Sequence, residues 1–355
     1  MRCWETVSIA GGQLSFARCP VKMTVTYGVE KCPARFDEYR CSLSDKYRAL
    51  ALEQLREDDT LREQALEAMR AWIAKHPYIR RCRTDSLFLL RFLRQRKFSI
   101  PVACEMLERY LAMRQTFPQW FQNLDPYEED LKELGSNDVF QVLGFDEKGR
   151  IVILIKAKNF NVERFTLIHL MRYLHMYAEI MASDERIQVA GIVLVVDCFN
   201  TTMMHFTLFN LSDMKNMMPY INHLIPVRCK EIHVIRLPKM SVTLVDILLT
   251  FISPKLKQRF FFHKTMIDAK KHLDKSLLPS EYNGTNDSME LSEAYHKKVF
   301  AAQAELALLD QMEIDVTKYS AMWNQNHVAS AAGGCGKASE IDSGMVGSFR
   351  KLNID

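Results

Sequence analysis

The sequence lacks the motifs that would mark it as a common type of enzyme or metalloprotein. It contains no G-x-S-x-G nucleophile elbow, no H-E-x-x-H pair and no histidine and cysteine cluster with zinc-ligand spacing. The tail fragment Gly334-Cys335-Gly336-Lys337 lacks the first glycine and the final Ser or Thr of a P-loop. Glu179, Asp197 and Glu231 are isolated in apolar surroundings, so we interpret them as structural hydrogen-bonding or ion-pairing groups. The sequence therefore predicts neither an enzyme nor a metal or cofactor site.

Long hydrophobic runs, paired cysteines and excess charge are also absent. No stretch reaches the roughly 20 apolar residues that a membrane-spanning helix needs. Glu5 interrupts the segment where a signal peptide would need its apolar core. The nine cysteines are scattered without a C-x-x-C motif, which is typical of reduced thiols in a cytoplasmic protein. The net charge of +4 gives no reason to expect nucleic-acid binding. Because no spanning helix is predicted, any membrane contact should be peripheral.

The first part of the chain divides into an irregular extension and a helical lobe. Residues 1–43 show no sustained hydrophobic period, and we expect them to form a variable, poorly ordered extension. Over residues 44–125 the period becomes helical. Capping signals predict three helix starts, at Asp59-Thr60, at Thr84-Asp85-Ser86 and at Ser99-Ile100-Pro101. These helices should form a compact N-terminal bundle.

Strands and helices alternate over residues 126–285, which we expect to form the main domain. Short apolar, β-branched runs predict strands at 139–143, 151–157, 189–196, 232–237 and 260–263. Helical patterns lie between them, at 165–182 and 205–222. This alternation predicts an α/β fold with a mostly parallel sheet flanked by helices. A last helix at about 288–313 lies within the segment 286–325, and the Gly-, Ala- and Ser-rich residues 326–355 predict a disordered tail.

The stretch from Pro226 to His263 contains an unusually apolar helix with cations at both ends. Residues 242–252 are apolar around most of the predicted helix, which lies between Pro238 and Ser253-Pro254. One interpretation is a core helix with solvated ends. The other is a movable lid over an apolar cavity, resting on an anionic membrane. The local pattern leaves both open.

Several segments of this chain together resemble the CRAL-TRIO family of lipid-transfer proteins. They are IPVRCKEIHVIRLP, the apolar helix after it, ISPKLKQR, SLLPSEYNG and, in the helical lobe, SLFLLRFLRQRKF. The resemblance covers about residues 45–315 and is strongest to the branch of the α-tocopherol transfer protein and the cellular retinaldehyde-binding protein. It implies a helical lobe followed by a sheet that forms the floor of one deep apolar pocket, with a mobile gate helix across the mouth.

The resemblance also implies a phosphoinositide site, and it shows two departures. The branch's phosphoinositide-binding basic residues match Arg96, Arg228, Lys230 and Lys255. Three residues after Asp197 the family usually has glycine, and here Asn200 stands there; asparagine tolerates left-handed backbone geometry, so the turn can survive. Leu174 and Ala178 replace more polar residues of the tocopherol branch, which favours a different, equally apolar cargo.

The residues themselves support an apolar pocket between the sheet and the helices at 165–182, 205–222 and 241–253. These helices have more apolar surface than one packed face requires, and methionine adapts to the shape of a flexible hydrocarbon. The methionines concerned are Met171, Met176, Met203, Met204, Met214, Met217 and Met218. The predicted lining residues are Met171, Leu174, Ala178, Val196, Met217, Ile221, Ile225, Val227, Ile232 and Leu248.

Three functions compete at this point. The first is a cytoplasmic, monomeric carrier that binds one hydrophobic lipid and associates transiently with phosphoinositide-containing membranes. The second is a lipid sensor that regulates a protein partner without transporting lipid. The third, an enzyme acting on a lipid, is opposed by the missing catalytic residues. The sequence does not name the cargo, because apolar side chains reject near-isosteres poorly.

Overall fold

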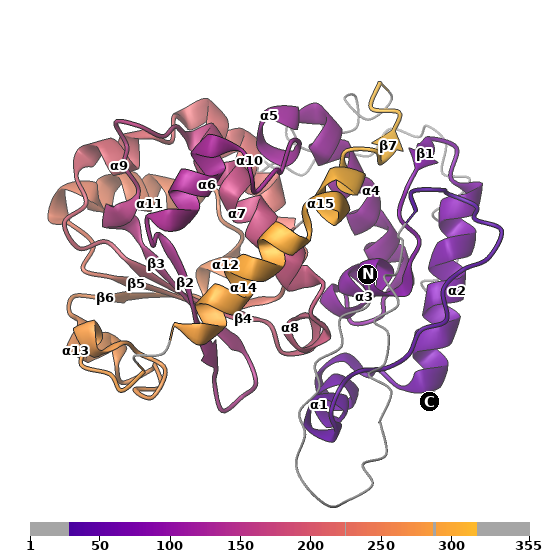
Figure 1. The fold of residues 1–355 in the computed structure, drawn as a ribbon, viewed down its shortest axis with the longest axis horizontal. Coiled ribbons are helices and arrows are strands. Elements are labelled where there is room, and N and C mark those ends of the chain that lie inside the picture. Colours follow the sequence, from indigo (N-terminus) through magenta and orange to yellow (C-terminus); the bar gives the residue numbers. More distant parts are fainter. Residues whose placement is uncertain (1–27, 224, 287–288, 318–355) are drawn as a thin grey trace, which may run out of the picture.

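A computed structural model describes residues 28–223, 225–286 and 289–317 of the chain. Figure 1 shows two parts side by side, a helical lobe from the first third of the chain and an α/β domain built around a twisted sheet. The helical lobe comprises α1 (Asp45–Leu55), α2 (Asp59–Lys75), α3 (Ser86–Gln95), α4 (Ile100–Thr116) and α5 (Pro118–Phe121). The next helix, α6 (Glu129–Ser136), already packs against the sheet domain. The predicted helix starts are confirmed within a residue.

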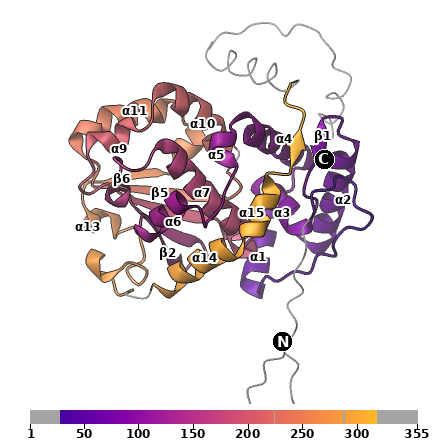
Figure 2. The same cartoon turned by 45° about the horizontal axis from the view of Figure 1, so that its top comes forward.

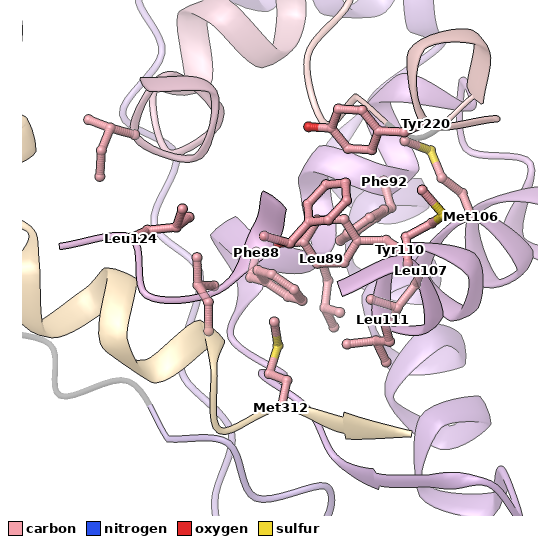
Figure 3. Close-up of a cluster of buried hydrophobic side chains, with 14 of the residues drawn as sticks. Phe88, Leu89, Phe92, Met106, Leu107, Tyr110, Leu111, Leu124, Tyr220 and Met312 are labelled. Atoms are coloured by element: carbon pink, nitrogen blue, oxygen red, sulfur yellow. The ribbon is translucent and has the colours of Figure 1, made fainter. Parts of the chain in front are cut away.

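Capping and an aromatic core explain the helical lobe. The carboxylates of Asp58 and Asp85 accept hydrogen bonds from backbone N–H groups in the first turns of α2 and α3. Figure 3 shows the centre of the lobe, where Phe88, Phe92 and Tyr110 pack edge to face. The apolar faces of α3 and α4 thus meet around these three rings.

The expected poorly ordered extension is corrected for residues 28–43, whereas residues 1–27 lie outside the described residues. The Asp37 carboxylate accepts from the Ser86 backbone N–H and from Arg70. The Ser42 hydroxyl donates to Glu185 at 2.6 Å, and the Arg62 guanidinium lies 4.6 Å from the centroid of the Tyr39 ring. Polar contacts with distant residues order this segment, so its own hydrophobic period could not reveal it.

The α/β domain contains a five-stranded sheet with the order β2-β3-β4-β5-β6. Its strands are β2 (Phe140–Phe145), β3 (Ile151–Lys156), β4 (Ile192–Asp197), β5 (Cys229–Ile235) and β6 (Phe260–His263). β2 and β3 form an antiparallel hairpin, closed by a turn at residues 146–149, and the other neighbours are parallel. The predicted mostly parallel sheet is confirmed.

Helices cover both faces of the sheet, as Figure 2 shows for α10 and α11 on one side and α13 on the other. The helices of this part are α7 (Leu167–Ala182), α8 (Glu185–Ala190), α9 (Met203–Thr207), α10 (Leu211–His223), α11 (Val242–Thr250), α12 (Pro254–Lys257) and α13 (Met266–Ala269), with short 3₁₀ turns η1 (Ala157–Asn159), η2 (Lys239–Ser241) and η3 (Ser280–Tyr282). Alternate strand residues therefore face two different apolar layers.

Three predicted elements differ from the observed ones. The strand expected from residue 189 begins only at Ile192, because residues 185–190 form α8 and Gly191, with φ +90°, turns the chain into the strand. The helix expected at 205–222 is split into α9 and α10. The expected last helix is split at Ala302 into α14 (Glu290–Ala301) and α15 (Gln303–Leu309), and a short strand follows.

The C-terminal elements join the two parts of the structure. In Figure 1, α14 and α15 run from the sheet domain to the helical lobe. There β7 (Glu313–Ile314) pairs antiparallel with β1 (Ile79–Arg81). Asp310 accepts hydrogen bonds from Arg114 at 2.9 Å and from the Asn123 N–H at 2.8 Å. The helical lobe is therefore held by residues from both ends of the described chain.

The three isolated acidic residues are ion-pair partners, as predicted. Glu179 accepts from Arg91 and Tyr110, each at 2.6 Å. Asp197 binds Arg236 and the Tyr282 hydroxyl. The remaining carboxylate, on β5, binds Arg150 at 2.6 Å and lies 3.3 Å from His233 Nε2. All three carboxylates thus have structural partners.

Candidate functional site

A cavity of about 440 Å³ lies between the sheet and helices α7, α10 and α11. This volume falls within the range of small-molecule sites, about 300–1,000 Å³. The structure brings all ten predicted lining residues into its wall: Met171, Leu174, Ala178, Val196, Met217, Ile221, Ile225, Val227, Ile232 and Leu248. They come from five elements and loops, so the fold alone assembles them.

Helical and strand periodicity explain which residues face the cavity. On α7, Met171, Leu174, Ala178 and Met181 follow one another at intervals of three and four, which places them on one face. On β4, Ile192, Leu194 and Val196 alternate with residues that face the other layer. The same alternation in the sequence could have identified Leu194, which the prediction missed.

The prediction also missed other cavity residues, some of which helical or strand spacing could have identified. They include Phe206 and Phe209 around α9, Val245 and Leu249 on α11, and Phe260 and Phe262 on β6. We expected several of the seven methionines to line the cavity, and four of them do. Met171, Met214, Met217 and Met218 line the cavity, whereas Met176 is packed in the core and Met203 and Met204 are exposed. The difference arises because α9 stands apart from α10 and directs its methionines outward.

Helix α11 covers the cavity as a lid, and the interpretation of a core helix is wrong. None of its residues is buried. Leu244, Val245 and Leu248 line the cavity, while Val242 and Ile247, on the same helix, are more than 40% exposed. Apolar side chains thus face both the cavity and the solvent, which is unusual for a helix of a soluble monomer and typical of a surface that meets a lipid or a partner.

The apolar exposure continues beyond α11. Met240 in η2 is 63% exposed and Met204 in α9 is 50% exposed, and α9 contacts η2. Figures 1 and 2 both place α9 and α11 at the end of the sheet domain that lies far from the helical lobe. Together with Val242 and Ile247, these exposed side chains form an apolar rim beside the cavity.

Two of the predicted basic residues, Arg228 and Lys230, lie together with Arg259. Arg228 donates to the Val189 carbonyl, Lys230 donates to Gln54 Oε1 at 3.0 Å, and Arg259 donates to the Cys229 carbonyl. All three of these acceptors are neutral. None of these three hydrogen bonds therefore neutralises the positive charge of the cluster.

The electrostatics show how close these cations are to one another. Burial, followed by Arg228, Arg259, Arg150 and Lys97, lowers the pKa of Lys230 to about 8. Burial and then Arg259 lower the pKa of Arg228 to about 10. Because like charges disfavour protonation, both shifts indicate a concentrated positive field that an anion would relieve.

The other two predicted basic residues have different surroundings. Burial lowers the pKa of Arg96, and its main charged neighbours are Glu105 and Arg109 of α4. Lys255 is an exposed residue of α12. The structure instead adds Arg259 and Lys97 to the cluster. Arg259 lies four residues after Lys255 in the same basic segment, so the charge pattern could have identified it.

Metal ligation and membrane spanning find no support in the described part of the chain. No group of three or more His, Cys, Asp or Glu side chains among the described residues could hold a metal ion. No helix in the described ranges is both long and apolar enough to cross a membrane.

Comparisons with known proteins agree with this architecture. Residues 136–284 match the family model of the CRAL/TRIO domain, and residues 58–131 match that of the Pinta-like UBA domain. The human protein "Alpha-tocopherol transfer protein-like" is 29% identical over 249 residues, which cover 70% of this chain and 72% of the relative. Human Clavesin-2 is 28% identical over 234 residues, 65% of this chain and 71% of that one. The solved structure of Sfh5 aligns with a TM-score of 0.42 and 11% identity, covering 75% of this chain and 99% of that chain.

Proposed function

We propose that this chain, whose residues 136–284 match the CRAL/TRIO domain, carries one hydrophobic lipid in the cavity and transfers it at phosphoinositide-containing membranes. The observation that carries the proposal is the cavity of about 440 Å³, whose wall consists almost wholly of apolar side chains. An empty apolar cavity lowers the stability of the folded protein, because the side chains that line it lack van der Waals contacts on one side. A hydrocarbon-rich guest supplies them.

The apolar rim and lid support the transfer step. Val242, Ile247 and Met240 present apolar surface to solvent beside the cavity. Inserted into a bilayer, these side chains would leave water, at a gain of about 25 cal/mol per Å² of apolar surface. The lid would then open into lipid rather than into water, so the cargo could pass without exposure.

The cluster formed by Arg228, Lys230 and Arg259, which we call the cation cluster, supports recognition of a phosphorylated headgroup. Its cations are partly buried and donate to neutral acceptors. Partial burial of a charge without a counter-charge is costly, and a phosphate offers several charge-assisted hydrogen bonds at once. An inositol phosphate headgroup therefore matches the cluster better than a singly charged lipid does.

The test separates cargo binding, membrane binding and transfer. Mass spectrometry of the protein purified from native cells identifies the bound lipid, and that lipid is then used in a transfer assay between two populations of vesicles. The double variant Arg228→Ala/Lys230→Ala should bind phosphoinositide vesicles roughly tenfold more weakly or worse, since each basic residue near an anionic surface contributes about 1 kcal/mol. Cargo binding in solution should stay nearly intact.

The matched control is Lys271→Ala/Lys275→Ala, which removes the same charge from two exposed residues in the segment after α13. Equal vesicle binding by both double variants would show that net charge, and not the cation cluster, attracts the membrane. A protein that holds lipid but does not transfer it between vesicles would instead be a sensor that acts on a protein partner. A protein purified from native cells without any lipid would count against both the carrier and the sensor function.

A further inference from the structure

Three histidines lie close together on the face of the sheet opposite the cavity. The ring centroids of His233 of β5 and His263 of β6 are 5.2 Å apart, and the ring of His272, which follows α13, lies 5.4 Å from that of His263. Figure 1 shows α13 beside β6. The residues next to these histidines in β5 and β6 line the cavity, so strand alternation directs the histidines to the other face. We call these three residues the histidine cluster.

The histidine cluster lies where both ends of the lid segment join the sheet. Residues 236–259, which contain η2, α11 and α12, leave the sheet after β5 and return to it at β6. β6 is the shortest strand of the five-stranded sheet and, in the described part of the chain, pairs only with β5. Arg236, with φ 57°, begins the segment, and its N–H donates to the His263 carbonyl at 3.0 Å. A change in the pairing of β5 with β6 therefore acts on the lid directly.

Hydrogen bonds across the cluster determine which ring nitrogens carry protons. His233 Nε2 lies 3.3 Å from the Glu231 carboxylate, so in the neutral ring this nitrogen carries the proton and donates. His233 Nδ1 is then an acceptor, and His263 Nε2, 2.9 Å away, donates to it. One added proton leaves this bond intact, because a cationic ring can donate to a neutral one. With both rings protonated, two N–H donors face each other and the side-chain bond between β5 and β6 is lost.

The surroundings of the cluster disfavour positive charge. Burial lowers the pKa of His233; Glu231 opposes this effect, whereas His263 and His272 add to it. Burial and then His272 lower the pKa of His263, against the pull of Asp268 of α13. The folded protein therefore keeps these two rings neutral at a pH of about 6.5, where an unperturbed histidine is half protonated.

The two carboxylates that border the cluster already have cationic partners. Glu231 binds Arg150 at 2.6 Å, and Asp268 lies 3.6 Å from Lys271. The adjoining strand β4 contributes Val195, an apolar neighbour, to this layer. A second positive charge in the cluster therefore gains little from its neighbours, and the repulsion between the charged rings decides the outcome.

We propose that the histidine cluster is a pH-sensitive clamp on the lid: when acidification protonates both His233 and His263, β6 separates from β5 and the lid is free to open. The clamp does not depend on the identity of the cargo, but its use in lipid delivery rests on the proposed carrier function. A membrane with a surface potential of about −30 mV lowers the pH at its surface by about half a unit. An anionic membrane would thus favour opening where the cargo is delivered.

Linkage gives the direction and the size of the effect. Because the folded-state pKa of each ring lies below the unfolded value of about 6.5, the clamp is fully present above that pH and is lost as the pH falls below it. Each proton taken up on opening raises the open fraction by up to about tenfold per pH unit. The first proton leaves the hydrogen bond intact, so one further proton is linked to opening. We expect a change of roughly three- to tenfold between pH 7.5 and 5.5.

Hydrogen exchange followed by mass spectrometry tests the clamp without any cargo. In wild type, the protection of amides in β6 and in residues 236–259, corrected for the intrinsic pH dependence of exchange, should fall roughly three- to tenfold from pH 7.5 to 5.5. His233→Phe and His263→Phe each remove one of the two titrating rings and keep an aromatic ring in its place. Either variant should reduce the fall to less than about twofold. If neither variant folds, NMR titration of the wild-type rings replaces them, and loss of protection should follow the second of the two protonation steps.

The matched control is His169→Gln. His169 stands at the start of α7, 3.2 Å from Asp130, and glutamine suits its position in the capping box of that helix. This variant should keep the full fall in protection. A second measurement follows the release of diphenylhexatriene, an apolar fluorophore, into phosphatidylcholine vesicles over the same pH range. Lys230, with a pKa of about 8, stays mostly charged in this range, and His175, with a pKa of about 4, stays neutral.

The outcomes separate the clamp from the carrier function. Unchanged protection of wild type on acidification would overturn the clamp, as would a full fall in both phenylalanine variants or the loss of the fall in His169→Gln. In the NMR titration, loss of protection that follows neither ring would overturn it as well. A fall in protection that depends on His233 and His263 would support the clamp even if wild type bound no fluorophore, and that failure would count against the carrier function alone.

Discussion

Arg94 should be a main determinant of stability, because it joins the helical lobe to the sheet domain through completely buried ion pairs. From α3 it donates to both carboxylate oxygens of Glu57, at 2.7 and 2.9 Å. It also donates to Glu185 of α8 at 3.0 Å and to Gln188 at 2.8 Å. The Arg94 side chain is fully buried, and the two carboxylate side chains are 1% and 6% exposed.

Replacing Arg94 by Met would keep much of its volume and leave two buried carboxylates without their main cation. Breaking a buried pair in this way costs about 3–5 kcal/mol. Arg62 lies 3.6 Å from Glu57 and can compensate in part, so we expect about 3 kcal/mol of lost unfolding free energy. The exposed pair Arg35–Glu38 provides the comparison: Arg35→Ala should cost less than about 1 kcal/mol.

Urea unfolding followed by circular dichroism would measure both variants. Wild type should unfold in one transition, because the buried contacts of Arg94 make the two parts cooperative. A loss below about 1 kcal/mol in Arg94→Met, or two separate transitions in wild type, would refute this reasoning. The first result would mean that the carboxylates relax into water; the second would mean that the parts fold independently.

The pH dependence gives an independent check of the same cluster. Burial opposes ionisation of Glu185, but Arg94, Ser42 and Tyr39 outweigh it, so its pKa lies below the ordinary value. A lowered folded-state pKa contributes stability that is present above the unfolded pKa, about 4.3, and is lost as the pH falls through the folded pKa. The difference in stability between wild type and Arg94→Met should therefore shrink on acidification below about pH 4.

Two further predictions concern the lid and the cation cluster. A chemical cross-link between cysteines introduced at Met204 of α9 and Met240 of η2, which are exposed on contacting elements, should block lipid exchange without lowering the melting temperature. Unchanged exchange in the linked form would exclude motion of the lid. Because the pKa of Lys230 is about 8, its charge is present below that pH and is lost above it. Binding of wild type to phosphoinositide vesicles should therefore weaken between about pH 7 and 9. The variant Lys230→Arg should remove this pH dependence.

The sequence predicted those parts of the site that depend on regular periodicity. Leu174 and Ala178, which were predicted, lie on the cavity face of α7 because three- and four-residue spacing from Met171 places them there, and Ile232 faces the cavity because strand residues alternate. The left-handed backbone expected at Asn200 is also present, with φ 56°. In each case neighbouring residues in the chain fix the geometry, so local pattern is sufficient.

Features that depend on distant residues could not be predicted in this way. The segment 28–43 is ordered by side chains such as Glu185, more than 140 residues away. The short β7 strand exists only because β1 lies beside it. The same limit applies to the ring contact of His175 with Tyr220, since only the folded chain brings these two residues together.

The two walls of the cavity differ in what holds them, and this difference indicates which one moves. Helix α7 is anchored by polar side chains: Glu179 binds Arg91, and Tyr177 binds His296. In the described structure, α11 makes no side-chain hydrogen bond to another element, and Thr250 bonds only to the Ile247 carbonyl of its own helix. Moving α7 would leave buried charges unpaired, at several kcal/mol. Moving α11 exchanges one set of apolar contacts for another, and at a bilayer surface the acyl chains provide that second set. The cavity should therefore open on the side of α11, with α7 staying in place to hold the cargo until the lid has moved.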